Sequence, residues 1–142
     1  MTIQEKQQQI IEEFSMFDDW MDKYSYLIEL GKELPPIDEK YKDNSHLISG
    51  CQSRVWLHAE MKDDGKIYFT ADSDAVITKG IVSLLIKVFS GHTPDEILQA
   101  DFGFLDKIGL KEHLSPTRSN GLLSMIKQIQ LYAKAYQLKS NQ

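Results

Sequence analysis

The spacing of apolar residues divides the chain into helical and extended segments. Between residues 3 and 14, and again between 20 and 28, apolar positions recur at helical intervals and predict two helices. Thr2 and Glu5 have the spacing of a capping box, so the first helix should begin beside Thr2. Gly31, followed by two prolines, predicts the end of the second helix. Residues 35–50 are rich in charges and turn residues and predict a loop.

After residue 54 the spacing of the apolar residues changes from helical to alternating. Residues 55–61 alternate between apolar and polar side chains, as a strand with one buried face does. Asp64-Gly65 is a typical hairpin turn, and a return strand should run through Ile67, Phe69 and Ala71. The sequence therefore predicts an antiparallel hairpin in the middle of the chain.

Helices should follow the hairpin. Residues 75–90 are apolar on most sides and predict a central helix, capped by Asp72 or Asp74 and ended by Gly91. Short helices are expected near residues 94–100 and 104–108, before a final amphipathic helix. Ser115-Pro116 fits the start of that last helix, although Asn120-Gly121 favours a later start. Helices on both sides of a hairpin indicate an α+β fold, expected as a single domain over residues 1–142 with Trp20 and Trp56 in its core.

Composition narrows the functional classes. A chain of 142 residues with 42% hydrophobic residues can bury one core. The net charge of −5 and scattered basic residues argue against nucleic-acid binding. The longest apolar stretch, IVSLLIKVF, is too short to span a bilayer, and the first residues lack the pattern of a signal peptide. We therefore expect a cytoplasmic protein that binds neither nucleic acid nor membrane.

The chain contains one cysteine, Cys51, within the segment SGCQSRVW. A free cysteine is often only a small buried residue, so a packing role is the first alternative. Its neighbours Gly50, Gln52 and Ser53 are not typical of a core and instead predict a loop before a strand, where reactive groups are common. A single cysteine cannot form an internal disulfide, which is consistent with a reducing compartment.

The remaining residues limit the chemistry open to this thiol. The four histidines show no spacing typical of metal ligands, so neither a metal site nor an iron–sulfur cluster is expected. A thiol hydrolase with His113 or His58 as base stays open as an alternative. Persulfide exchange, in which a thiolate receives sulfur and hands it on, needs only one cysteine.

Three segments carry a family resemblance: ISGCQSRVW, ADSDAVITKGIVSLL and HLSPTRSNGL. Together, and in this order, they resemble the SufE family of cysteine desulfuration proteins, and Cys51 matches the family's sulfur-acceptor position. The resemblance implies a fold like that of the scaffold protein IscU, with a three-stranded antiparallel sheet. The third strand would then lie near residues 46–48.

The resemblance also implies a function. SufE-like proteins receive sulfur from SufS, a cysteine desulfurase that holds the pyridoxal phosphate, and deliver it to a scaffold complex containing SufB. This chain would then need no cofactor and would stimulate its partner without turnover of its own. A CsdE-like acceptor serving the desulfurase CsdA, a regulatory binding module that uses Cys51 only for packing, and a homodimer all stay open.

Five further residues are candidates for supporting or partner-facing roles: Gly50, Gln52, Ser53, Asp74 and Arg118. Asp74 would cap its helix and could face the Cys51 loop. Arg118 is expected in the first turn of the last helix, an unfavourable place for a cation. We therefore expect Arg118 either to pair with Asp74 or to contact the partner.

Overall fold

The structure is a computed structural model that describes residues 1–48 and 53–140. The sheet found in these residues is an antiparallel hairpin of β1 (Val55–Met61) and β2 (Ile67–Ser73). Val55 pairs with Ser73 at one end and Met61 with Ile67 at the other. Gly65 has a φ of 76° in the connecting turn, a left-handed conformation that glycine adopts without steric cost. The predicted hairpin is therefore confirmed.

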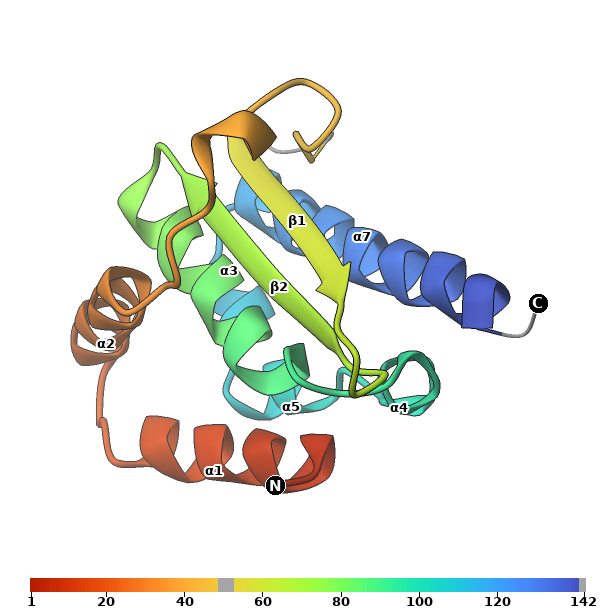
Figure 1. Ribbon diagram of the computed structural model, residues 1–142. Helices are drawn as coiled ribbons and strands as arrows, with labels where there is room; N and C mark the ends of the chain where they lie inside the picture. The colour runs from red at the N-terminus through yellow and green to blue at the C-terminus, as the bar shows by residue number, and fades with distance from the viewer. Residues whose placement is uncertain (49–52, 141–142) are drawn as a thin grey trace.

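Helices pack mainly against one face of this hairpin. In Figure 1, α3 and α7 run behind the two strands, α2 flanks α3, and α1 lies below α3 and α5. The helices are α1 (Ile3–Ser15), α2 (Trp20–Lys32), α3 (Val76–Phe89), α4 (Pro94–Gln99), α5 (Phe104–Lys107), α6 (Leu110–His113) and α7 (Pro116–Ser140), with a short 3₁₀ turn η1 (Glu39–Tyr41). The α+β class is confirmed.

The core lies between the hairpin and the helices behind it. Alternate residues of both strands are buried, including Leu57, Ala59 and Phe69. Ten of the fourteen residues of α3 are buried, which confirms its predicted central position. A helix that is apolar on most sides fits this place, because it is covered by the sheet and by other helices.

Two glycines allow α2 and α3 to approach closely. A Cβ atom added to Gly80 would lie 2.2 Å from the carbonyl oxygen of Leu27, and one added to Gly31 would lie 3.1 Å from the Gly80 nitrogen. The Ser83 hydroxyl also donates a hydrogen bond to the Leu30 carbonyl at 2.6 Å. Gly31 thus serves packing inside α2. Helix α2 ends at Lys32, one residue after Gly31 and before the two prolines, close to the predicted end.

The segment before β1 contributes less regular structure than expected. Leu47 forms one antiparallel bridge with Trp56, supported by a hydrogen bond of 2.8 Å from the Ile48 nitrogen to the Val55 carbonyl. The Leu57 nitrogen also donates to the His46 carbonyl at 3.0 Å. Within the described residues this pairing is an isolated bridge, so the predicted third strand is not confirmed there.

Side chains and loops bond to backbone groups at both edges of the hairpin. On β1, the hydroxyl groups of Tyr132 and Tyr136 in α7 donate to the carbonyls of Leu57 and Ala59, at 2.8 and 3.0 Å. On β2, the Ile67 nitrogen donates to the His92 carbonyl at 2.8 Å, and the Ile67 carbonyl accepts from the Gly91 nitrogen at 2.7 Å. These bonds tie the sheet to α7 on one side and to the end of α3 on the other.

Two helix starts agree with the sequence. Thr2 forms a capping box with Glu5 at α1, and Thr93 forms one with Glu96 at α4. Short helices were expected near α4 and α5, whereas α6 was not predicted from the sequence.

Two other starts differ from the sequence expectations. The N-cap of α3 is Ala75, so neither Asp72 nor Asp74 caps it; Asp72 forms ion pairs with two lysines instead. Helix α7 begins at Pro116 and runs straight through Asn120-Gly121, so the later start favoured by that pair is wrong. The Ser115 hydroxyl accepts a hydrogen bond from the Arg118 nitrogen at 3.3 Å, as the predicted cap should.

The two tryptophans are only partly buried. Trp20 packs against the edge of the core and stacks on His113, with ring centroids 4.0 Å apart. Trp56 lies on the face of β1 opposite Leu57, where the Lys42 ammonium approaches its ring at 5.8 Å. Trp56 is therefore outside the core in which it was expected. Among the described helices, including α7, none has the length and apolar character to cross a membrane.

Candidate functional site

Ser53 and Arg54, the first described residues after Cys51, are fixed to the start of α3. The Ser53 hydroxyl donates to the Thr78 hydroxyl at 3.1 Å, and Thr78 is buried. The Arg54 nitrogen donates to Asp74 Oδ1 at 2.9 Å, and the Asp74 nitrogen donates back to the Arg54 carbonyl at 3.2 Å. These bonds hold the entrance to β1 against the β2–α3 junction.

The residue just before the segment is also held. Ile48 is 5% exposed and bonded to Val55 as described above. It lines a shallow cavity whose other wall is formed by Ser124, Lys127, Gln128 and Leu131 of α7. Both flanks of residues 49–52 are therefore anchored, one against α7 and one against α3.

A second cavity, of about 300 Å³, lies beside Ser53. Two of its walls come from the start of α3 and the start of α7. Its lining residues are Ser53, Ala75, Thr78, Ile81, Thr117, Arg118, Gly121 and Met125. The structure thus brings Ser53 and Arg118, two residues selected from the sequence, to one cavity. Asp74 lies at the α3 end of it, next to Ala75.

Arg118 does not form the expected ion pair with Asp74. Among the described residues, no carboxylate lies within ion-pair distance of its guanidinium group, and the Arg118 side chain is exposed. Asp74 instead accepts the hydrogen bond from Arg54. The arginine is left as an exposed positive charge at the rim of the cavity.

Besides Arg118, a second charged residue lies nearby: Asp72, near the C-terminal end of β2. Asp72 Oδ2 lies 2.7 Å from Lys42 Nζ, and its Oδ1 lies 3.4 Å from Lys79 Nζ. Burial acts to raise the pKa of Asp72, but the hydrogen bonds from Lys42 and the Ser73 nitrogen outweigh it, and the pKa is lowered. As an ionised carboxylate, Asp72 therefore links β2 to α3 and to Lys42, the residue that follows η1.

Cys51, Gly50 and Gln52 lie outside the described residues. Their predicted roles remain predictions, and what the structure adds is the arrangement of the residues on either side. It also adds members of the cavity wall that sequence analysis missed. Thr78 and Met125 lie within apolar helical patterns, which indicated only packing.

The two histidines considered as hydrolase bases are placed elsewhere. His113 stacks on Trp20, and its Nδ1 lies 3.0 Å from the Gly109 carbonyl. His58 is on the outer face of β1, where it meets His46. Neither lines the cavity beside Ser53, so the described residues give the hydrolase alternative no support.

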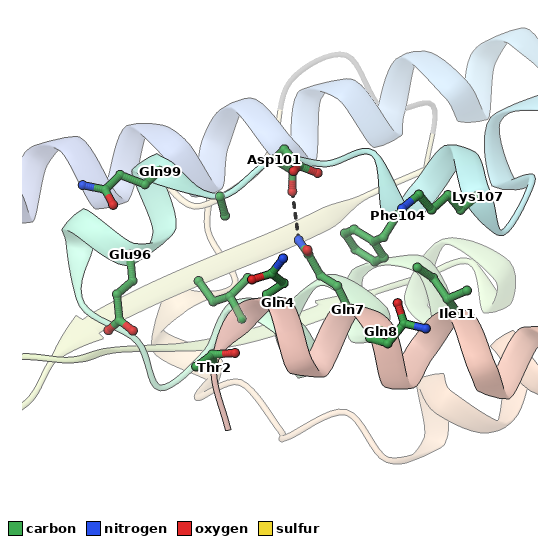
Figure 2. Close-up of a pocket in the computed structure, with 12 residues that line it drawn as sticks. Thr2, Gln4, Gln7, Gln8, Ile11, Glu96, Gln99, Asp101, Phe104 and Lys107 are labelled. Atoms are coloured by element: carbon green, nitrogen blue, oxygen red, sulfur yellow. Dashed lines mark hydrogen bonds between the residues drawn. The ribbon is translucent and has the colours of Figure 1, made fainter.

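A separate cavity, of about 480 Å³, is larger than the one beside Ser53. Figure 2 shows it between α1 and the α4–α5 segment, with the Gln7 side chain pointing toward Asp101. The Gln7 amide donates to the Asp101 carbonyl at 2.8 Å. Its lining residues include four glutamines, and none of the candidate residues contributes to it.

Comparison with known proteins decides the family. The family model described as "SufE: Fe-S metabolism associated domain" matches residues 8–133. The chain belongs to the SufE family. This range includes the cysteine segment, the hairpin, α3 and the cavity beside Ser53.

Relatives agree over nearly the whole chain. An uncharacterized SufE-like protein of Rhizobium etli is 44% identical over 130 residues, covering 89% of this chain and 88% of the relative. An uncharacterized SufE-like protein of Rhizobium meliloti is 42% identical over 130 residues, covering 89% of this chain and 93% of the relative.

A solved structure resembles the fold. The solution structure of a hypothetical protein from Thermus thermophilus matches with a TM-score of 0.78 over 94% of this chain and 96% of that one. At 23% identity, this match supports the arrangement of hairpin and helices and nothing more specific.

Proposed function

We propose that this SufE-family protein accepts sulfur on Cys51 from a SufS-like cysteine desulfurase and delivers it to a SufB-containing scaffold. The observation that carries the proposal is the family match over residues 8–133, a domain associated with Fe-S metabolism, in a chain with one cysteine. Sulfur transfer by persulfide exchange needs one thiol on the acceptor, and this chain has one. The reducing cytoplasm would keep that thiol free.

The transfer step balances without an oxidant or a cofactor on this chain. The Cys51 thiolate attacks the outer sulfur of the desulfurase persulfide, a new S–S bond forms on Cys51, and the donor S–S bond breaks. The desulfurase cysteine leaves as a thiolate. Pyridoxal phosphate stays on the desulfurase, and the protein stimulates its partner by removing the product sulfur.

Exposed apolar side chains near the site support docking of a protein partner. Leu47 is 37% exposed, Val76 60% and Leu123 52%, and each lies within two residues of a cavity-lining residue. Exposed apolar side chains mark an interaction surface when they form a contiguous patch, and these three are the candidates for such a patch. Arg118 adds a positive charge without a carboxylate partner among the described residues.

Mass analysis of the intact protein tests the proposal. Wild type and Cys51→Ser are each incubated with cysteine and a purified SufS-type desulfurase, with no reductant. We expect the mass of one additional sulfur atom on the wild type alone. No added sulfur, with a desulfurase shown to be active, would favour the regulatory binding module; sulfur on Cys51→Ser would show that another group is modified. Repeating the assay with a CsdA-type desulfurase tests the other partner.

A further inference from the structure

Two histidines meet on the outer face of the hairpin, away from the cavity beside Ser53. His58 lies on β1, between two residues that face the core, and its side chain therefore points away from α3. His46 lies in the segment that bridges to β1. The Nδ1 atom of His58 is 3.2 Å from the Nε2 atom of His46. Both side chains are largely buried, at 16% and 19% exposed.

The outer nitrogen of each ring is held by a carboxylate. His46 Nδ1 lies 2.7 Å from Asp43 Oδ1, and His58 Nε2 lies 3.0 Å from Glu60 Oε1. Ionised carboxylates only accept hydrogen bonds, so both of these ring nitrogens must carry a hydrogen. The Ser45 hydroxyl, 3.1 Å from His46 Nδ1, does not change this assignment, because it donates to Asp43 Oδ1 at 2.7 Å.

These assignments leave the facing nitrogens without a hydrogen between them. A neutral imidazole carries one N–H, and here each ring uses that N–H on its carboxylate. His46 Nε2 and His58 Nδ1 therefore turn two lone pairs toward each other at 3.2 Å. The contact is favourable only when a positive species lies between them, either an extra proton or a metal ion.

The spacing of the two rings fits a metal ion. Two imidazole nitrogens bound to one tetrahedral zinc at about 2.0–2.1 Å lie roughly 3.3 Å apart, with ring centroids roughly 5.2 Å apart. Here the nitrogens are 3.2 Å and the centroids 5.1 Å apart. We propose that His46 and His58 form a binding site for a divalent transition-metal ion of the zinc type.

The surrounding residues have the arrangement that supports metal-binding histidines. A carboxylate bonded to the outer nitrogen fixes the tautomer and increases the basicity of the binding nitrogen. Asp43 and Glu60 take this position on either side. Tyr41 stacks on the His58 ring with centroids 3.5 Å apart and planes 10° apart, which fixes its orientation.

The site is an open one. The described residues contain no group of three or more side chains that could hold a metal, so water or a group from another molecule must complete the coordination. Two protein ligands give weaker binding than a closed structural site with four. The inference does not depend on sulfur transfer, because Cys51 takes no part in it.

Calorimetric titration with Zn²⁺ alone tests the proposal. The parent protein for the titration is Cys51→Ser, which removes the thiol as a competing ligand; wild type is titrated alongside. We expect one Zn²⁺ per chain in both, and at least a tenfold weaker affinity in His46→Gln and in His58→Gln. Asp43→Asn and Glu60→Gln should weaken binding by roughly 10- to 100-fold. His113→Gln, which alters a histidine stacked on Trp20, is the matched control and should bind as the parent does.

A measurement on the unsubstituted histidines guards against variants that fail to fold. In nitrogen NMR of the Cys51→Ser protein, Zn²⁺ should shift the resonances of His46 Nε2 and His58 Nδ1 more than those of His113. The proposal is overturned if Cys51→Ser binds no Zn²⁺, or if both histidine variants bind as tightly as the parent. A shared proton that persists between the two nitrogens under saturating Zn²⁺ would also overturn it.

Discussion

The Ser53 hydroxyl donates a hydrogen bond of 3.1 Å to the hydroxyl of Thr78, across 25 residues of sequence. This bond joins Ser53, the first described residue after Cys51, to the buried face of α3. It shows that the two family segments around Cys51 and in α3 meet in space, as one site requires.

Removing the Thr78 hydroxyl should disturb that junction. In Thr78→Val, which keeps the shape, the Ser53 hydroxyl loses its partner at a half-buried position, and we expect stability to fall by about 1 kcal/mol. Sulfur loading of Cys51 should also slow. Urea unfolding and the rate of mass increase with a desulfurase measure the two effects. Thr78→Ser keeps the hydroxyl and should load near the wild-type rate; equally slow loading in both variants would mean that the hydrogen bond is not the cause.

Arg118 should contribute to partner docking and little to folding. Its side chain is exposed and has no carboxylate partner among the described residues, so Arg118→Gln should change stability by no more than about 0.5 kcal/mol. We expect a higher acceptor concentration for half-maximal stimulation of the desulfurase. Lys134→Gln, which removes an exposed charge further along α7, is the control. Identical concentration dependence in the two variants would contradict a specific role for Arg118.

Gly80→Ala should destabilise the protein although alanine favours helices. The added Cβ would lie 2.2 Å from the Leu27 carbonyl oxygen, a backbone atom that α2 cannot easily move. Overpacking of this kind costs roughly 1–3 kcal/mol, more than the gain of about 1 kcal/mol from helix propensity. Denaturant unfolding measures the difference. Gly103→Ala meets only the flexible Asp101 carboxylate and should be close to neutral, so a similar loss there would refute the steric explanation.

His92 should make stability depend on pH. Its pKa lies below the ordinary value of 6.5, first because of burial and then because of the Lys6 charge, while Glu96 acts in the opposite direction. Since the unfolded chain binds this proton more readily, His92 supports stability above pH 6.5, and that support is lost as the pH falls below it. We expect His92→Gln to lose less stability than wild type between about pH 7.5 and pH 5. Unfolding curves at both pH values, with the exposed His113→Gln as control, check this; equal losses in wild type and His92→Gln would exclude His92 as the source.

The sequence predicted the features that depend on local pattern. The alternation at residues 55–61, the Asp64-Gly65 turn and the Thr2–Glu5 capping box each act over a few residues, and all are present in the structure. Ser53 was selected as a polar neighbour of Cys51 and Arg118 as a cation in an unfavourable helix position, and both line one cavity.

The errors and omissions arise where contacts distant in sequence decide the outcome. Gly31 lies near the end of its helix as predicted, but the local pattern did not show that its lack of a side chain is required by the crossing with Gly80. Asp74 resembles an N-cap, but its carboxylate accepts a hydrogen bond from the Arg54 nitrogen at the start of the other strand. Asn120-Gly121 resembles a turn, yet Gly121 is buried inside α7 and lines the cavity beside Ser53.

The two tyrosines of α7 have a consequence for how this protein can associate. A hairpin of two strands has two open edges, and open edges invite aggregation or the addition of a strand from another chain. Here the outward carbonyls of Leu57 and Ala59 are already occupied by Tyr132 and Tyr136, and the outer backbone groups of Ile67 by the turn after α3. A partner that extended the sheet at the β1 edge would therefore first have to displace α7, whereas a partner that binds through side chains and loops leaves α7 in place.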